Sequence, residues 1–339
     1  MAGVTVAWLD GWRRVRRAPA VLLGVFGLTF AAAAPFAIVM RSALAAHLGS
    51  SLEAAAAASG ANWNWWQEFI SQASGVSATF TPRIVGFAAT LDSLSAILDG
   101  RLEASALLGL MAGYLALWTW LQGGIIDRFA RQRPTRTYGF AAVSSVFFFR
   151  FVRLGLVAGI VYWWLFSYLH PWLLDDRYTA LTRGLDSERA AFAWRVAAYA
   201  VFGLLLVAVN VIFDYTRIRM VVEDRRSAVA ALGAAVRFVL RSPRSIAGLW
   251  CANALVFVLA VTAWAFLAPG VVAAGAMMWL AFLAAQLFVL ARLALKLHFV
   301  ASQTALFQAS LAHARYAAAP LPRWPESPII ESVTYPEVR

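Results

Sequence analysis

The stretch "FDYTRIRMVVEDRRSAVAALGAAVRFVLRSP", residues 213–243, connects two long apolar runs of the chain. Its first half holds Asp214 with Arg217 and Arg219 with Glu223, at spacings that bring side chains together on one helix face. The preceding apolar helix is therefore expected to continue as far as a turn at EDRRS, residues 223–227. A helix end stabilised by ion pairs within the helix explains these pairs. A docking surface for another subunit, including Arg217 and Arg219, is the alternative interpretation.

The second half of the stretch is amphipathic. Its apolar residues fall on one helical face that the arginines avoid; they are Val229, Leu232, Val236, Val239 and Leu240. Such a helix is expected to lie in the plane of the membrane interface, with Arg237 and Arg241 toward head groups. Pro243 is then suited to the first turn of the next helix.

The same pattern occurs near the start of the chain. Arg13-x-Val15-x-Arg17-x-Pro19 recurs as Arg237-x-Val239-x-Arg241-x-Pro243. The stretch "FFFRFVRLGLVAG", residues 147–159, resembles this pattern more loosely. The pattern predicts three units, 1–126, 135–213 and 225–300, each an interfacial helix followed by a two-span hairpin. Chance is the alternative, because any membrane protein accumulates arginines before inward-starting spans.

Composition and segment length indicate an integral membrane protein. The 339 residues are 62% hydrophobic and 14% charged, whereas soluble domains carry about 25% charged residues. Six segments approach the roughly 20 apolar residues that cross a bilayer: 18–40, 104–126, 154–174, 190–213, 245–267 and 271–295. We expect an all-α fold with six transmembrane helices in one membrane domain, residues 1–317, followed by a proline-rich cytoplasmic tail, residues 318–339.

The arginines predict the orientation. They concentrate in 1–17, 127–153 and 214–244, and are fewer in 41–103 and 171–189. The positive-inside rule then places both termini in the cytoplasm. The net charge of +12 is accordingly expected to face anionic phospholipids, at about 1 kcal/mol per arginine near the surface. Nucleic acid is not an expected partner.

The outer segment 41–103 contains "ANWNWWQEFISQ", residues 61–72. We expect this segment to form short amphipathic helices that cover the outer face of the bundle. Tryptophan favours the membrane interface, so Trp63, Trp65 and Trp66 are interpreted chiefly as anchors or lid packing. A lipid or partner site is the alternative, with head-group contacts from Asn62, Asn64 and Glu68.

Few residues suggest catalysis, and no catalytic residue, cofactor or metal is expected. The single cysteine, Cys251, excludes an intramolecular disulfide. Strongly polar residues inside the spans are limited to Asn210, Asn253 and Gln286, with Gln122 at the margin, and no carboxylate is expected at mid-depth. Arg292 and Lys296 are expected to snorkel to the interface; a cytoplasmic vestibule is the alternative.

Two stretches carry a resemblance. "NWNWWQEF…TFTPRIVGFAATLDSLSAILDG" together with "DYTRIRMVVEDRRSA" resembles uncharacterised six-span bacterial inner-membrane proteins. The chain is more loosely similar to the membrane domain attached to some glycerophosphodiester phosphodiesterases. This resemblance implies a location in the inner membrane of a bacterium and transfers no catalytic residue.

The expected function is non-enzymatic: a structural or accessory subunit of a larger membrane complex, made with other membrane-protein subunits and carrying bound lipid. A permease subunit of an ATP-binding-cassette transporter is the first alternative, because an elbow helix and a cytoplasmic helix are both expected here. The second is an enzyme acting on lipid head groups, which requires His47, His170 and Asp175 or Asp176 to converge.

Overall fold

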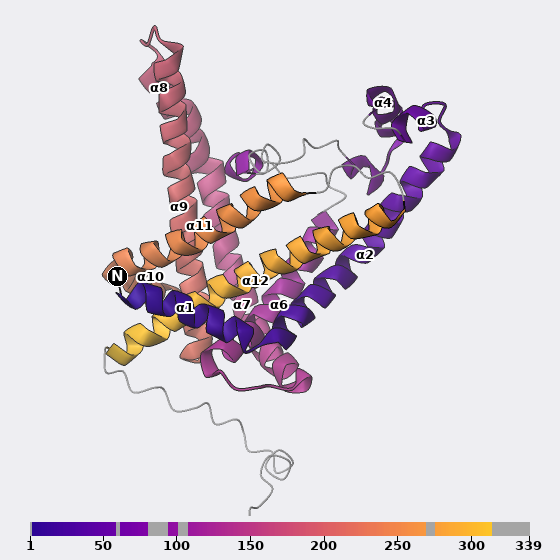
Figure 1. Cartoon of the computed structure of the whole chain (residues 1–339). Helices are drawn as coiled ribbons and strands as arrows, with labels where there is room; N and C mark the ends of the chain where they lie inside the picture. Colours follow the sequence, from indigo (N-terminus) through magenta and orange to yellow (C-terminus); the bar gives the residue numbers. More distant parts are fainter. Residues whose placement is uncertain (1, 59–61, 81–93, 101–107, 269–274, 314–339) are drawn as a thin grey trace, which may run out of the picture.

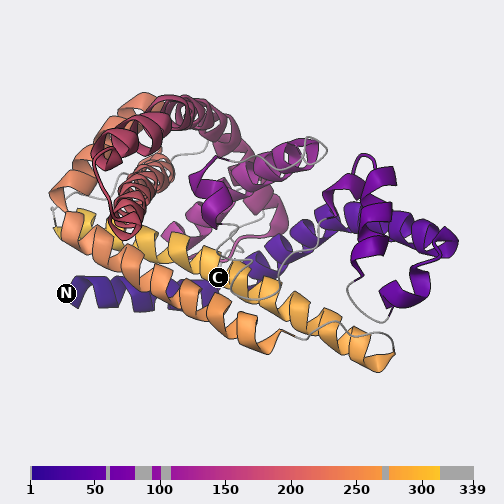
Figure 2. The same cartoon turned by 90° about the horizontal axis from the view of Figure 1, so that it is seen from above.

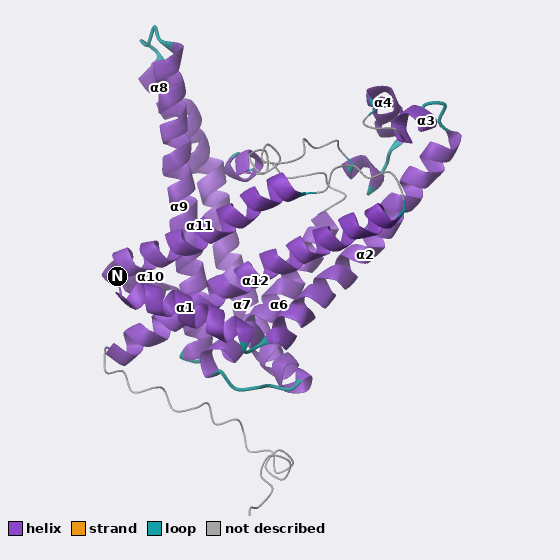
Figure 3. Cartoon of the chain, in the orientation of Figure 1, coloured by secondary structure: helices purple, strands orange, loops and turns teal. Residues whose placement is uncertain are grey.

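The computed structural model describes residues 2–58, 62–80, 94–100, 108–268 and 275–313. The expected helix at 84–98 is described only from residue 94, and the tail 318–339 lies outside these residues. All regular elements in the described ranges are helices (Figure 3), which confirms the all-α class.

Six long helices run back and forth between two ends of the molecule (Figure 1). They are α2 (Pro19–Ser50), α6 (Leu108–Arg131), α7 (Thr137–Trp164), α9 (Glu188–Val222), α11 (Pro243–Leu267) and α12 (Ala276–His313). Short helices flank them: α1 (Ala2–Arg16), α3 (Ala54–Ala58), α4 (Trp63–Gln72), η1 (Ser77–Thr79) and α10 (Ala228–Arg241). The helix of α7 continues through η3 (Leu165–Leu169) and η4 (Trp172–Arg177) into α8 (Tyr178–Thr182).

Five helices in the described part of the chain are long and apolar enough to cross a membrane. They are Pro19–Ser50, Thr137–Thr182, Glu188–Val222, Pro243–Leu267 and Ala276–Leu311. The chain therefore has the composition of a multi-pass membrane protein. The remaining predicted span, 104–126, falls on α6, whose described part begins at Leu108.

The two closely matching arginine patterns form the same local structure. Ala18 has φ −132° and ψ 53° between α1 and α2, and Ser242 has φ −131° and ψ 45° between α10 and α11. Pro19 and Pro243 begin the following helices, where a proline loses no helical hydrogen bond. The third, looser pattern differs: residues 147–159 lie inside the uninterrupted helix α7. No separate interfacial helix precedes this span, because no proline breaks the helix at that position.

Helix α10 is present where expected, but alanines form its buried face. Ala231 and Ala235 are fully buried, and the helix packs against α9. Small side chains permit this close approach. Val229 and Leu240 are instead 69% and 73% exposed.

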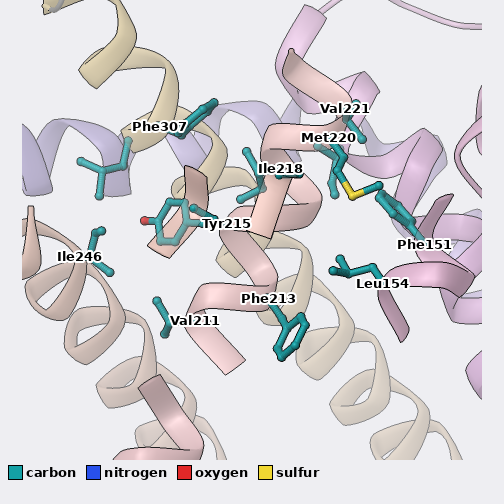
Figure 4. Close-up of a cluster of buried hydrophobic side chains, with 14 of the residues drawn as sticks. Phe151, Leu154, Val211, Phe213, Tyr215, Ile218, Met220, Val221, Ile246 and Phe307 are labelled. Atoms are coloured by element: carbon teal, nitrogen blue, oxygen red, sulfur yellow. The ribbon is translucent and has the colours of Figure 1, made fainter. Parts of the chain in front are cut away.

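A large cluster of buried apolar side chains lies toward the lower end of the molecule in Figure 1, which we call the base. Side chains of α7, α9, α11 and α12 meet there (Figure 4), and the labelled ones are Phe151, Leu154, Val211, Phe213, Tyr215, Ile218, Met220, Val221, Ile246 and Phe307. The most apolar windows of the five long helices are only 6% to 22% buried. This contrast is physically reasonable, because lipid-exposed helices gain no hydrophobic free energy by packing on one another.

Helix α1 is an integral part of the base. It packs along α12 and α11 (Figure 2). A Cβ added to Gly11 would lie 2.8 Å from the Ser302 Cβ, and the Trp12 ring stacks on His298 with centroids 4.3 Å apart. An interfacial helix held only by lipid would not make these contacts.

Candidate functional site

A cavity of about 1290 Å³ lies between α6, α7, α9, α11 and α12, with Thr29 of α2 at its edge. Ligand pockets typically measure about 300–1,000 Å³, so this cavity has room for a large ligand. It is a large concave feature that brings five helices together, and we treat it as the candidate site.

Most of the cavity wall is apolar. The apolar residues that form it come from α6, α7, α11 and α12 and include Leu115, Trp118, Phe148, Val152, Leu156, Trp250, Ala254, Phe257, Val258, Val289 and Leu293. Gly155 and Gly159 of α7 also line the wall, and a Cβ added to either would meet no atom within 4 Å. The cavity is therefore suited to a hydrocarbon chain.

Polar and charged side chains from two helices also line the cavity. Helix α9 contributes Asn210, Asp214 and Arg217, and α12 contributes Arg292, Lys296 and Gln303. Within each helix these residues recur at spacings of three or four, or multiples that keep them on one face. A polar strip on each of two long apolar helices was thus visible in the sequence, although the sequence does not show that the two strips face each other.

The contacts within this charged group are specific. Arg217 Nη1 lies 2.9 Å from Asp214 Oδ1, and Gln303 Nε2 donates to Asp214 Oδ2 at 3.4 Å. Lys296 Nζ lies 3.5 Å from the centroid of the Trp118 ring, and it interacts electrostatically with Arg217, Arg292 and Asp214. Three cations therefore share the cavity with one carboxylate.

These positions bear on two expectations. Arg292 and Lys296 line the cavity, a position that both the vestibule alternative and snorkelling permit. Asp214 is a cavity carboxylate within a helix that is long and apolar enough to span a membrane. It lies eight residues before the end of α9 at Val222, just beyond the predicted span, which ended at position 213.

The expected pairs on α9 are confirmed, and the helix ends at Val222 just before the predicted turn. Arg219 Nε lies 2.9 Å from Glu223 Oε2, and Arg219 Nη1 donates to the Ala234 carbonyl at 2.7 Å. These bonds connect α9 to α10 within one chain. The turn itself is held by Arg150, whose Nη1 lies 2.6 Å from Asp224 Oδ1.

The tryptophan cluster belongs to α4 and is attached to the end of α2. Asn62 caps α4 by accepting from the Trp65 amide at 2.9 Å, and Glu68 accepts from the Ser51 hydroxyl at 2.6 Å. Trp65 packs against His47, with ring centroids 5.9 Å apart. Asn62 and Glu68 thus serve the fold of this segment.

The other two rings of the cluster pair with each other. Trp63 and Trp66 have centroids 4.7 Å apart, and Trp63 is 63% exposed. Asn64 is exposed as well. No residue of α4 lines the cavity.

The candidate head-group arginines are mainly at the surface. Arg13, Arg17, Arg237 and Arg241 are all exposed. Arg17 also binds the second basic connection, since its carbonyl accepts from Arg128 at 2.9 Å. The basic connections therefore meet at the base.

Two of the histidines in the described ranges pack against aromatic rings. His47 packs against Trp65 and Phe69, while His170 packs against Phe166 and Phe202. No group of three or more histidine, cysteine, aspartate or glutamate residues suited to a metal occurs among the residues searched.

Comparison of the chain with models of protein families, with curated proteins and with solved structures finds no match. Its function must therefore be argued from the site itself.

Proposed function

We propose that this chain is a non-enzymatic membrane protein of the bacterial inner membrane that holds one amphiphilic ligand, a lipid, in the cavity between α6 and α12. The observation that carries the proposal is the cavity itself. It combines an extended apolar wall with a localised group of charged side chains, and that combination matches a molecule with a hydrocarbon chain and a polar head.

The proposed orientation has six spans and both termini in the cytoplasm. Its support is the convergence of the basic connections at the base, where Arg128 contacts Arg17 and Arg150 contacts Asp224. The base would then face the anionic inner leaflet. In this arrangement the protein acts as an accessory subunit that presents or retains a lipid within a larger assembly.

A permease subunit is the second candidate. Ionisable residues inside a membrane bundle commonly mark a substrate path, and Asp214, Arg217, Arg292 and Lys296 are such residues. An ATPase purified in fixed proportion with the chain would favour this candidate.

The test is native mass spectrometry of the protein purified from its own membrane in a mild detergent. We expect one retained lipid per chain. Gly159→Leu should reduce its occupancy by filling the cavity, because a side chain at Gly159 enters free space in the cavity wall.

Gly139→Leu is the matched control, since Gly139 lies on the same helix, outside the cavity lining, with no atom within 4 Å of an added Cβ. Wild-type protein without a retained lipid, or equal retention in both variants, would contradict the proposal.

A further inference from the structure

The charges in the cavity identify the class of its ligand. Building on the proposed lipid-binding function, we infer that the ligand is an anionic lipid whose head group binds Lys296, Arg292 and Arg217, and that Asp214 competes with this head group for Arg217.

The charges that line the cavity do not balance. Arg217, Arg292 and Lys296 line the cavity with Asp214 as the accompanying carboxylate, so the group carries an excess of two positive charges. The Arg292 and Lys296 side chains are exposed in the cavity, so a ligand that enters it can reach both cations. An anionic head group supplies the missing negative charge, whereas a cationic ligand would increase the imbalance.

The two cations on α12 are available to a ligand. Within the described residues, Lys296 and Arg292 form no ion pair, and their close contacts are with aromatic rings. Lys296 lies over Trp118 and Arg292 lies 5.8 Å from the Phe288 centroid. A ring face attracts a cation but leaves its N–H groups available to accept an oxyanion.

Asp214 already occupies one of the three cations. It binds Arg217 at 2.9 Å and accepts from Gln303 at 3.4 Å. Asp214 is thus an internal anion already in place beside the cations. A head group that approaches Arg217 must share or replace this contact, so removal of the Asp214 charge should strengthen anion binding.

The apolar wall of the cavity distinguishes a lipid from a free inorganic anion as the ligand. Trp250, Phe257 and Val258 of α11 form part of the same cavity, and a small anion would leave this wall without contacts. A ligand with both an anionic head and a hydrocarbon chain satisfies both parts of the cavity.

The experiment uses delipidated full-length protein in detergent, offered equal amounts of phosphatidylglycerol and phosphatidylcholine with identical acyl chains. Native mass spectrometry gives the ratio of the two lipids retained. We expect phosphatidylglycerol to be preferred, and Lys296→Met to lower this preference about tenfold, as expected for one charge-assisted contact. Arg153→Met is the control, since Arg153 is exposed and lies outside the cavity lining.

Asp214→Asn provides a test of opposite sign that retains the side-chain size. Its preference for phosphatidylglycerol should rise, and this result cannot be produced by a misfolded variant. Inorganic phosphate at millimolar concentration is added in a second arm. Displacement of phosphatidylglycerol by phosphate would overturn the assignment to a lipid, and undiminished retention supports it.

The two proposals fail in different ways. Equal retention of both lipids by the wild type, or an unchanged ratio in Lys296→Met and Asp214→Asn, would overturn the anionic assignment and leave lipid binding intact. Absence of either lipid from the wild type would contradict the proposed function itself.

Discussion

At the scale of single residues, Arg14 differs from the arginines around it. Arg13, Arg16 and Arg17 are exposed, whereas Arg14 is 7% exposed. Its guanidinium pairs with Asp10 at 2.8 Å, donates to the Phe129 carbonyl at 2.9 Å and donates to Gln308 Oε1 at 2.6 Å. One side chain therefore joins α1, α6 and α12.

Replacement of Arg14 should destabilise the base. Arg14→Ala leaves Asp10 and the Phe129 carbonyl without this partner. Because the Asp10 side chain is 29% exposed, the expected cost is that of a lost charge-assisted hydrogen bond, about 1.5–3 kcal/mol. Denaturation of the purified protein in detergent measures the change. Arg13→Ala should have little effect, and equal stabilities of the two variants would show that the Arg14 contacts are unimportant.

The sequence contained a partial signal for this residue. Asp10 and Arg14 are four apart, the spacing of a helical ion pair, but the basic segment was interpreted as a uniform head-group contact. Its burial depends on Phe129 and Gln308. Contacts so distant along the chain cannot be derived from a local pattern.

At the scale of helices, α1 is held by a close approach to α12. An added Cβ at Gly11 would come within 2.9 Å of the Ser302 backbone, so glycine is required there. A side chain at this position must push the two helices apart or shift the backbone of α12.

We therefore expect Gly11→Ala to lower the stability by about 1–3 kcal/mol, the usual cost of overpacking. Thermal unfolding in detergent reports the loss. Gly3→Ala is the control on the same helix, because a Cβ there meets no atom within 4 Å. If both variants melt alike, α1 does not depend on this contact.

Helix boundaries show where sequence analysis succeeds and fails. Apolar length identified the long helices, since each apolar run needs an environment without water. It placed the end of the last span at 295, whereas α12 continues to His313. Ser302, Gln303 and Thr304 are buried in this last part of α12. From sequence alone, polar residues that are covered by α1 and other parts of the protein cannot be distinguished from polar residues that lie outside the membrane.

The cavity was also only partly predictable. Arg292 and Lys296 were recognised as a vestibule alternative, and Asn210 and Gln122 as polar residues inside spans. Their convergence with Asp214 requires the registers of α6, α9 and α12 against one another, and packing across the base sets these registers.

At the scale of the whole molecule, α4 and α10 lie at opposite ends of the bundle (Figure 1). Between α4 and α10 the chain forms the long helices α6, α7 and α9. The two short helices face opposite sides of a membrane only if all three of these long helices cross it. Helix α6 is thus the element that distinguishes a six-span from a five-span protein.

Cysteine labelling resolves this question. Cys251→Ala removes the native thiol, and Asn64→Cys or Arg226→Cys then introduces one reporter at exposed positions of the described chain. In intact cells whose outer membrane has been made permeable, an impermeant maleimide should label Asn64→Cys alone. Labelling of both positions from the same side would contradict the six-span proposal.

The contacts of α1 also determine when the protein can complete its assembly. Arg14 and its partner Gln308 are 294 residues apart, and chains are synthesised at about 5–20 residues per second. The first helix must therefore wait about 15–60 s before its last partner is made. During that interval Trp8, Trp12 and the arginines of α1 form an amphipathic surface that α12 does not yet cover. An amphipathic helix of this kind binds at the membrane interface. The interfacial location predicted from the sequence would then describe α1 during biosynthesis, before α12 replaces the lipid.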